Sequence, residues 1–253
     1  MPRGYKKAKT SGAARQARQF RFDESLALFQ YMLSLFGCTS LDSLCEGMKD
    51  ETWEGWDEQN ISRYYYFLTT RLFEYPGITK EQLLRYDQNI TSQTMAISGR
   101  RGAFRWKYFQ YMALLFSEIY LDKYFNDPQG LLDGLNAQVT LLNSEREAVD
   151  KLPPYVLDDL NKVAFWQATG SGKTLIMHVN ILQYRHYLEK AGKHATLNRV
   201  ILLTPNEGLS EQHNGEFKLS SLPADIFNKE SGSLYAGQEI SIIDIHKLKE
   251  EGK

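Results

Sequence analysis

One stretch, residues 163–188, constrains the fold of this 253-residue chain more than any other. The short apolar run Val163–Trp166 is followed by a turn with glycines at 170 and 172. Apolar residues then recur at helical spacing over Thr174–Leu188. A buried strand that turns through glycines into a helix is typical of a parallel sheet whose strands are joined by crossover helices. The sequence therefore predicts an α/β fold for this part of the chain.

The pattern continues towards the C-terminus. An apolar run at Val200–Leu203 predicts a second strand, a helix is expected from Leu209, and Glu239–Ile243 predicts a third strand. We expect residues 160–253 to form a separate α/β domain with an incomplete parallel sheet.

The glycine turn has the composition of a phosphate-binding loop. In Thr169-Gly170-Ser171-Gly172-Lys173-Thr174, the glycines let backbone N–H groups converge on an anion, and the helix that follows adds the positive end of its dipole. Lys173 is expected to reach the β- and γ-phosphates of ATP, and the Thr174 hydroxyl is expected to ligate Mg²⁺. Gln167 stands where the general pattern has a glycine. The alternative, a strand-to-helix turn without chemistry, does not account for the Lys-Thr pair.

A second motif follows the Val200–Leu203 strand. Thr204-Pro205-Asn206 leads into the helix expected from Leu209, so free backbone N–H groups and two neutral side chains could meet a phosphate. Taken alone, the same tripeptide is equally well explained as an ordinary turn.

Taken together, these motifs carry a family resemblance. The run from Gln167 to Thr174 and the Thr204-Pro205-Asn206 turn resemble motifs I and Ia of superfamily 2 helicases. The stretch 162–246 is most similar to DEAD/DEAH-box proteins related to the type III restriction enzyme Res subunit. The resemblance implies that residues 160–253 are a partial P-loop (RecA-like) motor domain. The resemblance implies ATP and Mg²⁺ as cofactors, ATP hydrolysis, and a nucleic acid, expected to be DNA, bound through Thr204, Pro205 and Asn206. It also implies that the protein is a DNA translocase or helicase. Such a motor could belong to a restriction or phage-defence system and could have a methyltransferase or nuclease subunit as its partner.

A third feature lies upstream. Arg105, Tyr108, Gln110 and Ala113 are spaced like the element that reads adenine in many of these motors, which would make Gln110 a nucleotide ligand. Gln110 lies 57 residues before Gln167, farther than usual, so a connector would have to loop out. The alternative, a polar position on a core helix, stays open.

Residues 22–125 are predicted to be helical, with no strand. Residues 126–159 contain several prolines and glycines and are predicted to be a connector with one short helix. Four helices are expected in the first region. The first spans Leu26–Phe36, is capped by Asp23 or Ser25 and ends at Gly37, and the second spans Ser62–Phe73 and ends at Tyr75-Pro76-Gly77. The third is capped by Thr79 with Gln82, and the fourth spans Phe104–Phe125.

Composition narrows the class of protein. Residues 1–21 carry seven cations and no acid, which is expected of a disordered tail and also allows a contact with nucleic acid. No apolar run reaches the roughly 18 residues of a membrane span, and no secretory signal is apparent. Cys38 and Cys45 lack the spacing of a metal site, so reduced thiols in a cytoplasmic protein are expected.

The acid pair that ATP hydrolysis requires is not identifiable. Asp244 follows an apolar strand, but Ile245 stands where a second acid is expected. The catalytic residues are therefore unassigned, and we expect the chain to be an amino-terminal fragment that hydrolyses ATP negligibly by itself. Two other interpretations remain open: a P-loop NTPase that does not act on nucleic acid, and a nucleotide-binding module without turnover.

Overall fold

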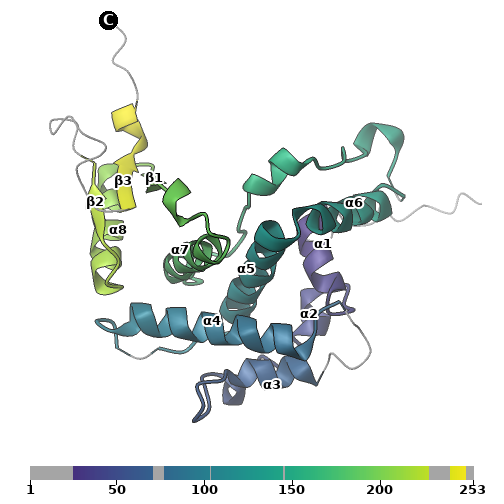
Figure 1. Ribbon diagram of the computed structural model, residues 1–253, viewed down its shortest axis with the longest axis horizontal. Helices are drawn as coiled ribbons and strands as arrows, with labels where there is room; N and C mark the ends of the chain where they lie inside the picture. The colour runs from purple at the N-terminus through teal and green to yellow at the C-terminus, as the bar shows by residue number, and fades with distance from the viewer. Residues whose placement is uncertain (1–24, 71–76, 103, 145, 228–239, 249–253) are drawn as a thin grey trace, which may run out of the picture.

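The computed structural model describes residues 25–70, 77–102, 104–144, 146–227 and 240–248. A helical part and a small α/β part lie side by side and meet at one long helix (Figure 1). The predicted basic tail, residues 1–21, and most of the predicted Tyr75-Pro76-Gly77 turn lie outside the described residues. Cys38 and Cys45 are not joined in a disulfide, and Cys45 is buried.

The helices predicted for the first region are present. Their bounds are α1 Ala27–Ser34, α2 Leu41–Leu44, α3 Arg63–Thr69, α4 Lys80–Ser98 and α5 Tyr108–Asn126, with a 3-10 turn, η2, at Glu51–Trp53. The predicted capping box of α4 is confirmed: Thr79 Oγ1 accepts from the Gln82 amide, and the Thr79 amide donates to Gln82 Oε1. The cap of α1 was predicted wrongly, because its N-cap residue is Leu26, which makes no side-chain bond.

The connector prediction was wrong for its first half. Residues Pro128–Ser144 form the long helix α6, which packs on α1 and α5. Pro128 occupies the first helical position, where a missing N–H costs nothing. Gly134 lies against the ring of Tyr31, because a Cβ there would stand 2.4 Å from Cε2 of that ring. These residues start the helix and allow close packing; they do not break it. The rest of the connector contains the short turns η3, Ala148–Asp150, and η4, Leu157–Asn161.

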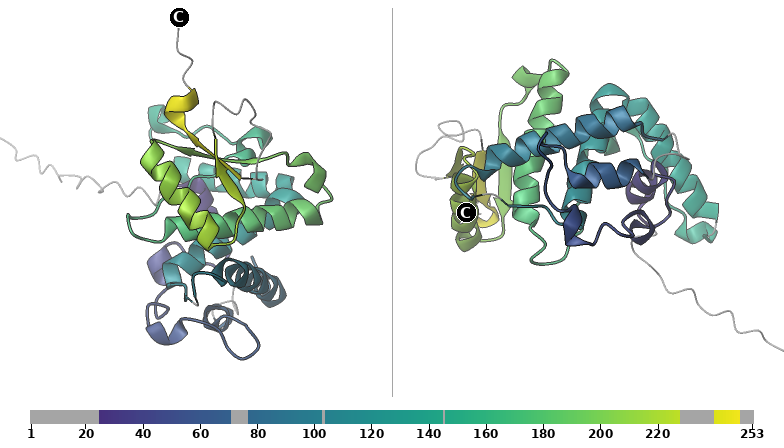
Figure 2. Two further views of the ribbon diagram at one scale, coloured as in Figure 1. Left: turned by 90° about the vertical axis from the view of Figure 1, so that its left-hand side faces the viewer. Right: turned by 90° about the horizontal axis from the view of Figure 1, so that it is seen from below.

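The α/β part consists of α7 Lys173–Lys190, the turn η5 His194–Thr196, β1 Val200–Thr204, α8 Glu207–Leu219, β2 Ala224–Ile226, β3 Ile240–Asp244 and the turn η7 Ile245–Leu248. The three strands are parallel in the order β1-β3-β2, with Val200 opposite Ile240 and Thr204 opposite Asp244. All five residues of β3, the central strand, are buried. The left view in Figure 2 shows α8 lying over the strands, against which it packs. The parallel α/β prediction is confirmed.

The predicted strand at Val163–Trp166 is absent. These residues have no regular structure, and Val163, Phe165 and Trp166 are exposed. The physical reason is that no described strand lies alongside to accept and donate their backbone hydrogen bonds. Conversely, β2 was missed because three residues are too short to show a period in the sequence.

Helix α7 joins the two parts. It lies between the sheet and α5 (Figures 1 and 2), and it packs on both α5 and α4. Gln183 Nε2 donates to the Leu114 carbonyl at 3.0 Å, and the Tyr187 hydroxyl donates to Glu118 at 2.7 Å. Buried apolar residues form one continuous cluster from α1 through α7 to β3. The helical and α/β parts therefore share a core.

A second link joins the loop after α4 to the end of α8. The Arg101 guanidinium pairs with the Glu216 carboxylate at 2.6 Å and donates to Ser220 Oγ at 2.9 Å. Ser220 Oγ also lies 2.7 Å from Nδ1 of His178 on α7. Burial lowers the pKa of His178 to about 3, so its ring is neutral, and the direction of the bond between Nδ1 and Ser220 Oγ is set by the ring's tautomer. One polar chain thus connects α4, α8 and α7.

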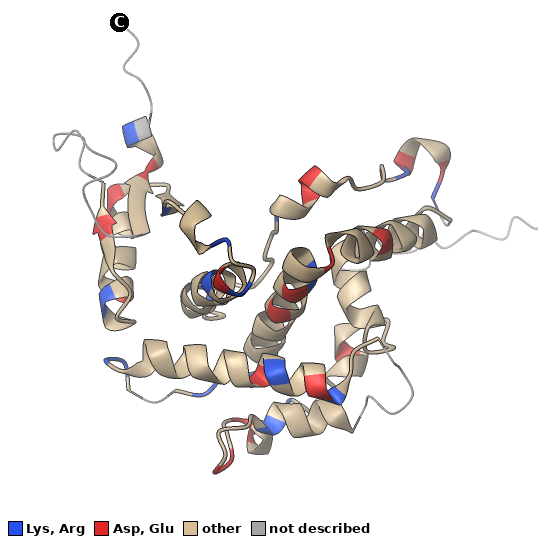
Figure 3. Cartoon of the chain, in the orientation of Figure 1, with Lys and Arg blue, Asp and Glu red and all other residues tan. Residues whose placement is uncertain are grey.

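Charged residues are unevenly distributed. Acidic residues crowd the segment between α2 and α3, at the end of the molecule away from the sheet (Figure 3). Lys107 pairs there with Glu54 at 2.8 Å and with Glu51 at 3.3 Å. Among the described residues, no helix is both long and apolar enough to cross a bilayer.

The Glu118 carboxyl is buried where α4, α5 and α7 meet. Its Oε2 accepts from Asn89 Nδ2 and from the Tyr187 hydroxyl, whereas its Oε1 and the Oε1 of nearby Gln183 have no hydrogen-bond partner. Burial raises the pKa of Glu118 to about 7, the neighbouring Asp122 contributing in the same direction. The burial of this carboxyl, with one oxygen unpaired, favours its protonated form.

We predict that Glu118→Gln reduces the pH dependence of stability. The folded protein holds this proton up to about pH 7, whereas the unfolded chain releases it near pH 4.5. The stabilisation is complete below pH 4.5 and is lost as the pH rises to about 7, by about 3 kcal/mol at most. Urea unfolding of wild type and variant at several pH values between 4.5 and 8 measures the difference in slope.

Asp87 provides the control, because burial also raises its pKa, to about 6. Asp87→Asn should remove a separate portion of the slope at lower pH. If wild type and Glu118→Gln have the same slope, Glu118 does not carry a proton in the folded protein.

Candidate phosphate-binding site

The phosphate loop has the backbone geometry that its glycines were predicted to provide. Gly170 and Gly172 have φ values of 78° and 84°, in the left-handed region that other residues rarely adopt. Gly172 is the N-cap of α7, and Lys173 is the first residue of the helix. The loop therefore ends on the free N–H groups and positive dipole of a helix of 18 residues.

Lys173 folds over the loop. Its Nζ donates to the carbonyls of Ala168 at 2.7 Å and Gln167 at 3.2 Å. The side chain is exposed, so these bonds compete with water and the ammonium group is free to move to a stronger acceptor. A triphosphate at this loop would supply one.

Gln167, the departure from the general pattern, has a structural role. Its Oε1 accepts a hydrogen bond from Ser171 Oγ at 3.2 Å, and the Ser171 amide donates to the Ala168 carbonyl at 3.3 Å. The Gln167 side chain thus joins the two ends of the loop. The phosphate-loop motif by itself does not indicate this role.

Gln110 reaches this loop from α5. Its Nε2 donates to the Ser171 carbonyl at 2.8 Å, and its Oε1 accepts from the Lys107 amide at 2.9 Å. The structure therefore brings Gln110 to the phosphate loop although 57 residues separate it from Gln167. Both ends of the amide are used within the chain, so reading adenine would require one of these bonds to open. Adenine recognition by Gln110 stays a prediction.

The remaining predicted ligands differ in exposure. Thr169 is exposed, and Thr174 is half-buried in the first turn of α7. The Thr174 hydroxyl has no hydrogen bond to another described residue, so it is available as an oxygen ligand. With the left-handed glycines, the helix N-terminus and the movable Lys173, these residues fit a nucleotide triphosphate with its Mg²⁺.

The Thr204-Pro205-Asn206 turn leads into α8, as predicted, but its side chains point elsewhere than expected. Thr204 is buried and its hydroxyl bonds Ser210 Oγ at 2.6 Å, because its face of β1 packs inward. Asn206 is the N-cap of α8, and its Oδ1 accepts from the Leu209 amide at 2.9 Å. The exposed part of the turn is therefore Pro205, Asn206 and the first amides of α8, those of Glu207 and Gly208.

Asp244 ends β3 opposite Thr204 and is buried. Its Oδ1 accepts from the His246 amide at 2.9 Å, so the carboxylate caps the turn η7. The described part of the chain contains no cluster of three or more His, Cys, Asp or Glu arranged to hold a metal ion.

Comparison with known proteins agrees with this geometry. Residues 136–252 match the family model of the type III restriction enzyme, res subunit, a superfamily 2 helicase-like domain. The match includes the phosphate loop, α7, β1 and α8. No curated protein and no solved structure matches the chain. The family inferred from the sequence motifs is confirmed for this region.

We predict that Gly172→Ala lowers the free energy of unfolding by about 1–2 kcal/mol, because the residue has a left-handed backbone. An added Cβ would also stand 2.5 Å from Gln110 Nε2. In the Gln110→Ala background the cost of Gly172→Ala should therefore be smaller. A double-mutant cycle by urea unfolding measures this coupling.

Gly170→Ala is the matched control. Gly170 has a similar φ of 78°, but an added Cβ would meet nothing within 4 Å. Its cost should be the same with and without Gln110→Ala. Equal coupling for the two glycines would mean that Gln110 does not pack on the loop in solution.

Proposed function

We propose that this chain, whose residues 136–252 form a superfamily 2 helicase-like domain, is the ATP-binding part of an ATP-dependent DNA translocase or helicase. The observation that carries the proposal is the loop from Gln167 to Lys173, with two left-handed glycines, at the N-terminus of α7. This family of motors generally uses ATP and Mg²⁺.

In this proposal the loop amides and the N-terminus of α7 bind the phosphates. Lys173 leaves the carbonyls of Gln167 and Ala168 and pairs with the β- and γ-phosphates. Thr174 provides a hydroxyl ligand for Mg²⁺, which supplies charge neutralisation on the phosphates when bound. Gln110, by holding the Ser171 carbonyl, keeps the loop against α5.

The nucleic-acid contact is proposed at the N-terminus of α8. The amides of Glu207 and Gly208 donate to no other described residue, and Asn206 is exposed beside them. Such donors suit a phosphate of a nucleic-acid backbone and carry no base specificity. The acidic segment between α2 and α3 lies away from this end of the sheet, so it would not repel a strand bound there (Figure 3). The family implies interaction with nucleic acid and a methylase partner in general. DNA as the nucleic acid and a nuclease subunit as an alternative partner are part of the proposal.

We predict that Lys173→Ala weakens binding of a fluorescent ATP analogue about ten- to hundredfold. A charge-assisted phosphate contact contributes about 1.5–3 kcal/mol, and its loss has that effect on affinity. Lys162→Ala, an exposed cation before the loop, is the control and should bind normally. Equal affinity of wild type and Lys173→Ala would remove the basis for the phosphate loop.

We predict that Asn206→Asp weakens DNA binding about two- to fivefold at low salt. Aspartate caps a helix as well as asparagine does, so α8 should remain folded, but its charge repels a phosphate. Fluorescence anisotropy with labelled DNA of two unrelated sequences should show the same loss for both. Affinity for the ATP analogue should not change.

Asn198→Asp makes the same charge change just before β1, at the opposite end of the strand from the turn. This variant should bind DNA as wild type does. If both variants lose affinity equally, the effect is one of net charge and the α8 contact is wrong. If neither does, while nucleotide binding depends on Lys173, a nucleotide-binding protein without this nucleic-acid contact is the better interpretation.

A further inference from the structure

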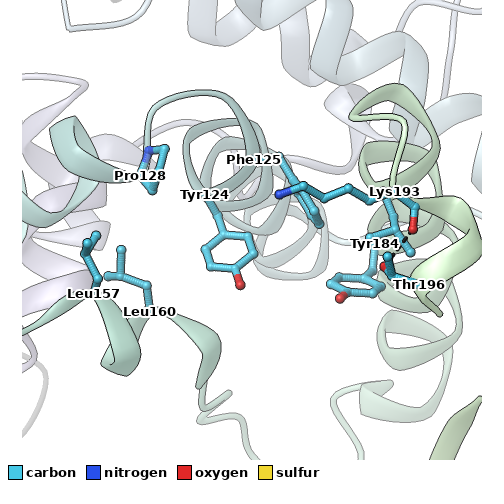
Figure 4. Close-up of a pocket in the computed structure, with 9 residues that line it drawn as sticks. Tyr124, Phe125, Pro128, Leu157, Leu160, Tyr184, Lys193 and Thr196 are labelled. Carbon is cyan, nitrogen blue, oxygen red and sulfur yellow. Dashed lines mark hydrogen bonds between the residues drawn. The ribbon is translucent and has the colours of Figure 1, made fainter. Parts of the chain in front are cut away.

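A pocket of about 380 Å³ lies at the far end of α7 from the phosphate loop. Its walls come from the end of α5, the start of α6, the turn η4, the second half of α7 and the turn η5 (Figure 4). The volume is within the range of small-molecule sites. From Lys173 to Tyr184 the helix rises about 16 Å, so the pocket and the phosphate loop are separate sites.

Three aromatic rings dominate the pocket. Tyr124 and Phe125 come from α5, and Tyr184 comes from α7. The Phe125 and Tyr184 ring centres are 5.7 Å apart, and those of Tyr124 and Phe125 are 5.1 Å apart. In Figure 4 the hydroxyls of Tyr124 and Tyr184 point to the same side of the pocket. Leu157 and Leu160 form the opposite wall, and more of the exposed lining of the pocket is polar than apolar.

The Thr196 hydroxyl of the pocket donates to the Lys193 carbonyl at 2.7 Å, whereas three other polar groups are unpaired within the described part of the chain. The hydroxyls of Tyr124 and Tyr184 and the ammonium group of Lys193 have no hydrogen-bond partner among the described residues. Lys193 is exposed, and in the view of Figure 4 its side chain extends from the start of η5 towards Phe125 on α5. Burial raises the pKa of Tyr184, so this hydroxyl stays protonated and able to donate. The pocket thus combines aromatic faces, two hydroxyls and one cation.

We propose that this pocket binds a planar aromatic anion of nucleotide size, a base carrying one phosphate. The base stacks on Tyr124 or Tyr184, as bases stack on aromatic side chains in single-strand-binding proteins. Lys193 pairs with the phosphate, and the tyrosine hydroxyls bond polar atoms of the base or sugar. The same chemistry is found in a free mononucleotide and in one residue of a single strand. The proposal does not depend on the phosphate loop.

Calorimetric titration of the Lys173→Ala variant tests it, since the phosphate loop is then weakened. The probes are AMP, adenosine, ribose 5-phosphate, dTMP and the octamer of thymidylate. AMP should bind best of the first three. Ribose 5-phosphate should bind about fivefold more weakly or worse, because it lacks the ring. Adenosine should bind about tenfold more weakly, because it lacks the charge.

Matched variants locate the site. Added to Lys173→Ala, Tyr184→Leu should weaken AMP about fivefold or more, whereas Tyr184→Phe should keep most of the stacking. Lys193→Gln should weaken AMP about tenfold, and Lys190→Gln should have no effect, because Lys190 lies over the Tyr187 ring outside the pocket. Thermal unfolding of each variant identifies any that fail to fold, and Lys193→Gln, at an exposed position, is the variant least able to disturb the fold.

If the octamer binds more tightly than dTMP and depends on the same residues, the natural ligand is a nucleic-acid strand. If dTMP binds more tightly than the octamer, the natural ligand is a free nucleotide. Absence of AMP, dTMP and octamer binding overturns the proposal. So does binding that Tyr184→Leu and Lys193→Gln leave unchanged, or equal affinity for AMP and ribose 5-phosphate.

Discussion

The packing of α7 against α5 and α4 is the interaction on which the rest of the structure depends. The helix carries the phosphate loop at its first residue, and its position is set by contacts with the helical part. Tyr187 and Gln183 make buried hydrogen bonds to α5, and Val179 and Leu188 are buried beside them. Buried hydrogen bonds are costly to leave unmade, so they fix one register of α7 against α5. The helical part thus supports the loop proposed to bind phosphate.

The same packing explains how Gln110 reaches the loop. Gln110 lies in the first turn of α5, and Ser171 immediately precedes the start of α7. Because the two helices are in contact, their N-terminal ends come together and the amide bonds the Ser171 carbonyl. The long spacing in sequence is taken up by α6 and the short turns that follow it. Distance along the chain was therefore a poor guide to distance in space.

Local signals predicted what local physics determines. The Thr79 cap, the glycine loop and the N-terminus of α8 follow from short motifs whose hydrogen bonds close within a few residues, and β1 and β3 follow from their apolar runs although they pair with each other across forty residues. The sequence-based predictions failed where long-range contacts determine the structure. Gly134 favours a break in the helix by its residue type, but in the structure it lies inside α6 against the Tyr31 ring. Val163–Trp166 has the composition of a strand, but no described strand lies beside it to form backbone hydrogen bonds. At the candidate site, the motif identified Lys173 and its glycines. The inward turn of Thr204 and the role of Gln167 depend on partners that the motif does not include.

The bond from Arg101 to Glu216 and Ser220 has a consequence for folding. It closes a loop of more than a hundred residues, which contains α5, α6, the phosphate loop and β1. Closing so long a loop costs more entropy than forming a helix cap or a local turn, and contacts of this kind slow folding. The contact therefore belongs to the part of the fold that local structure cannot form by itself, because it joins the end of α8 to the loop after α4 across α5, α6, α7 and β1.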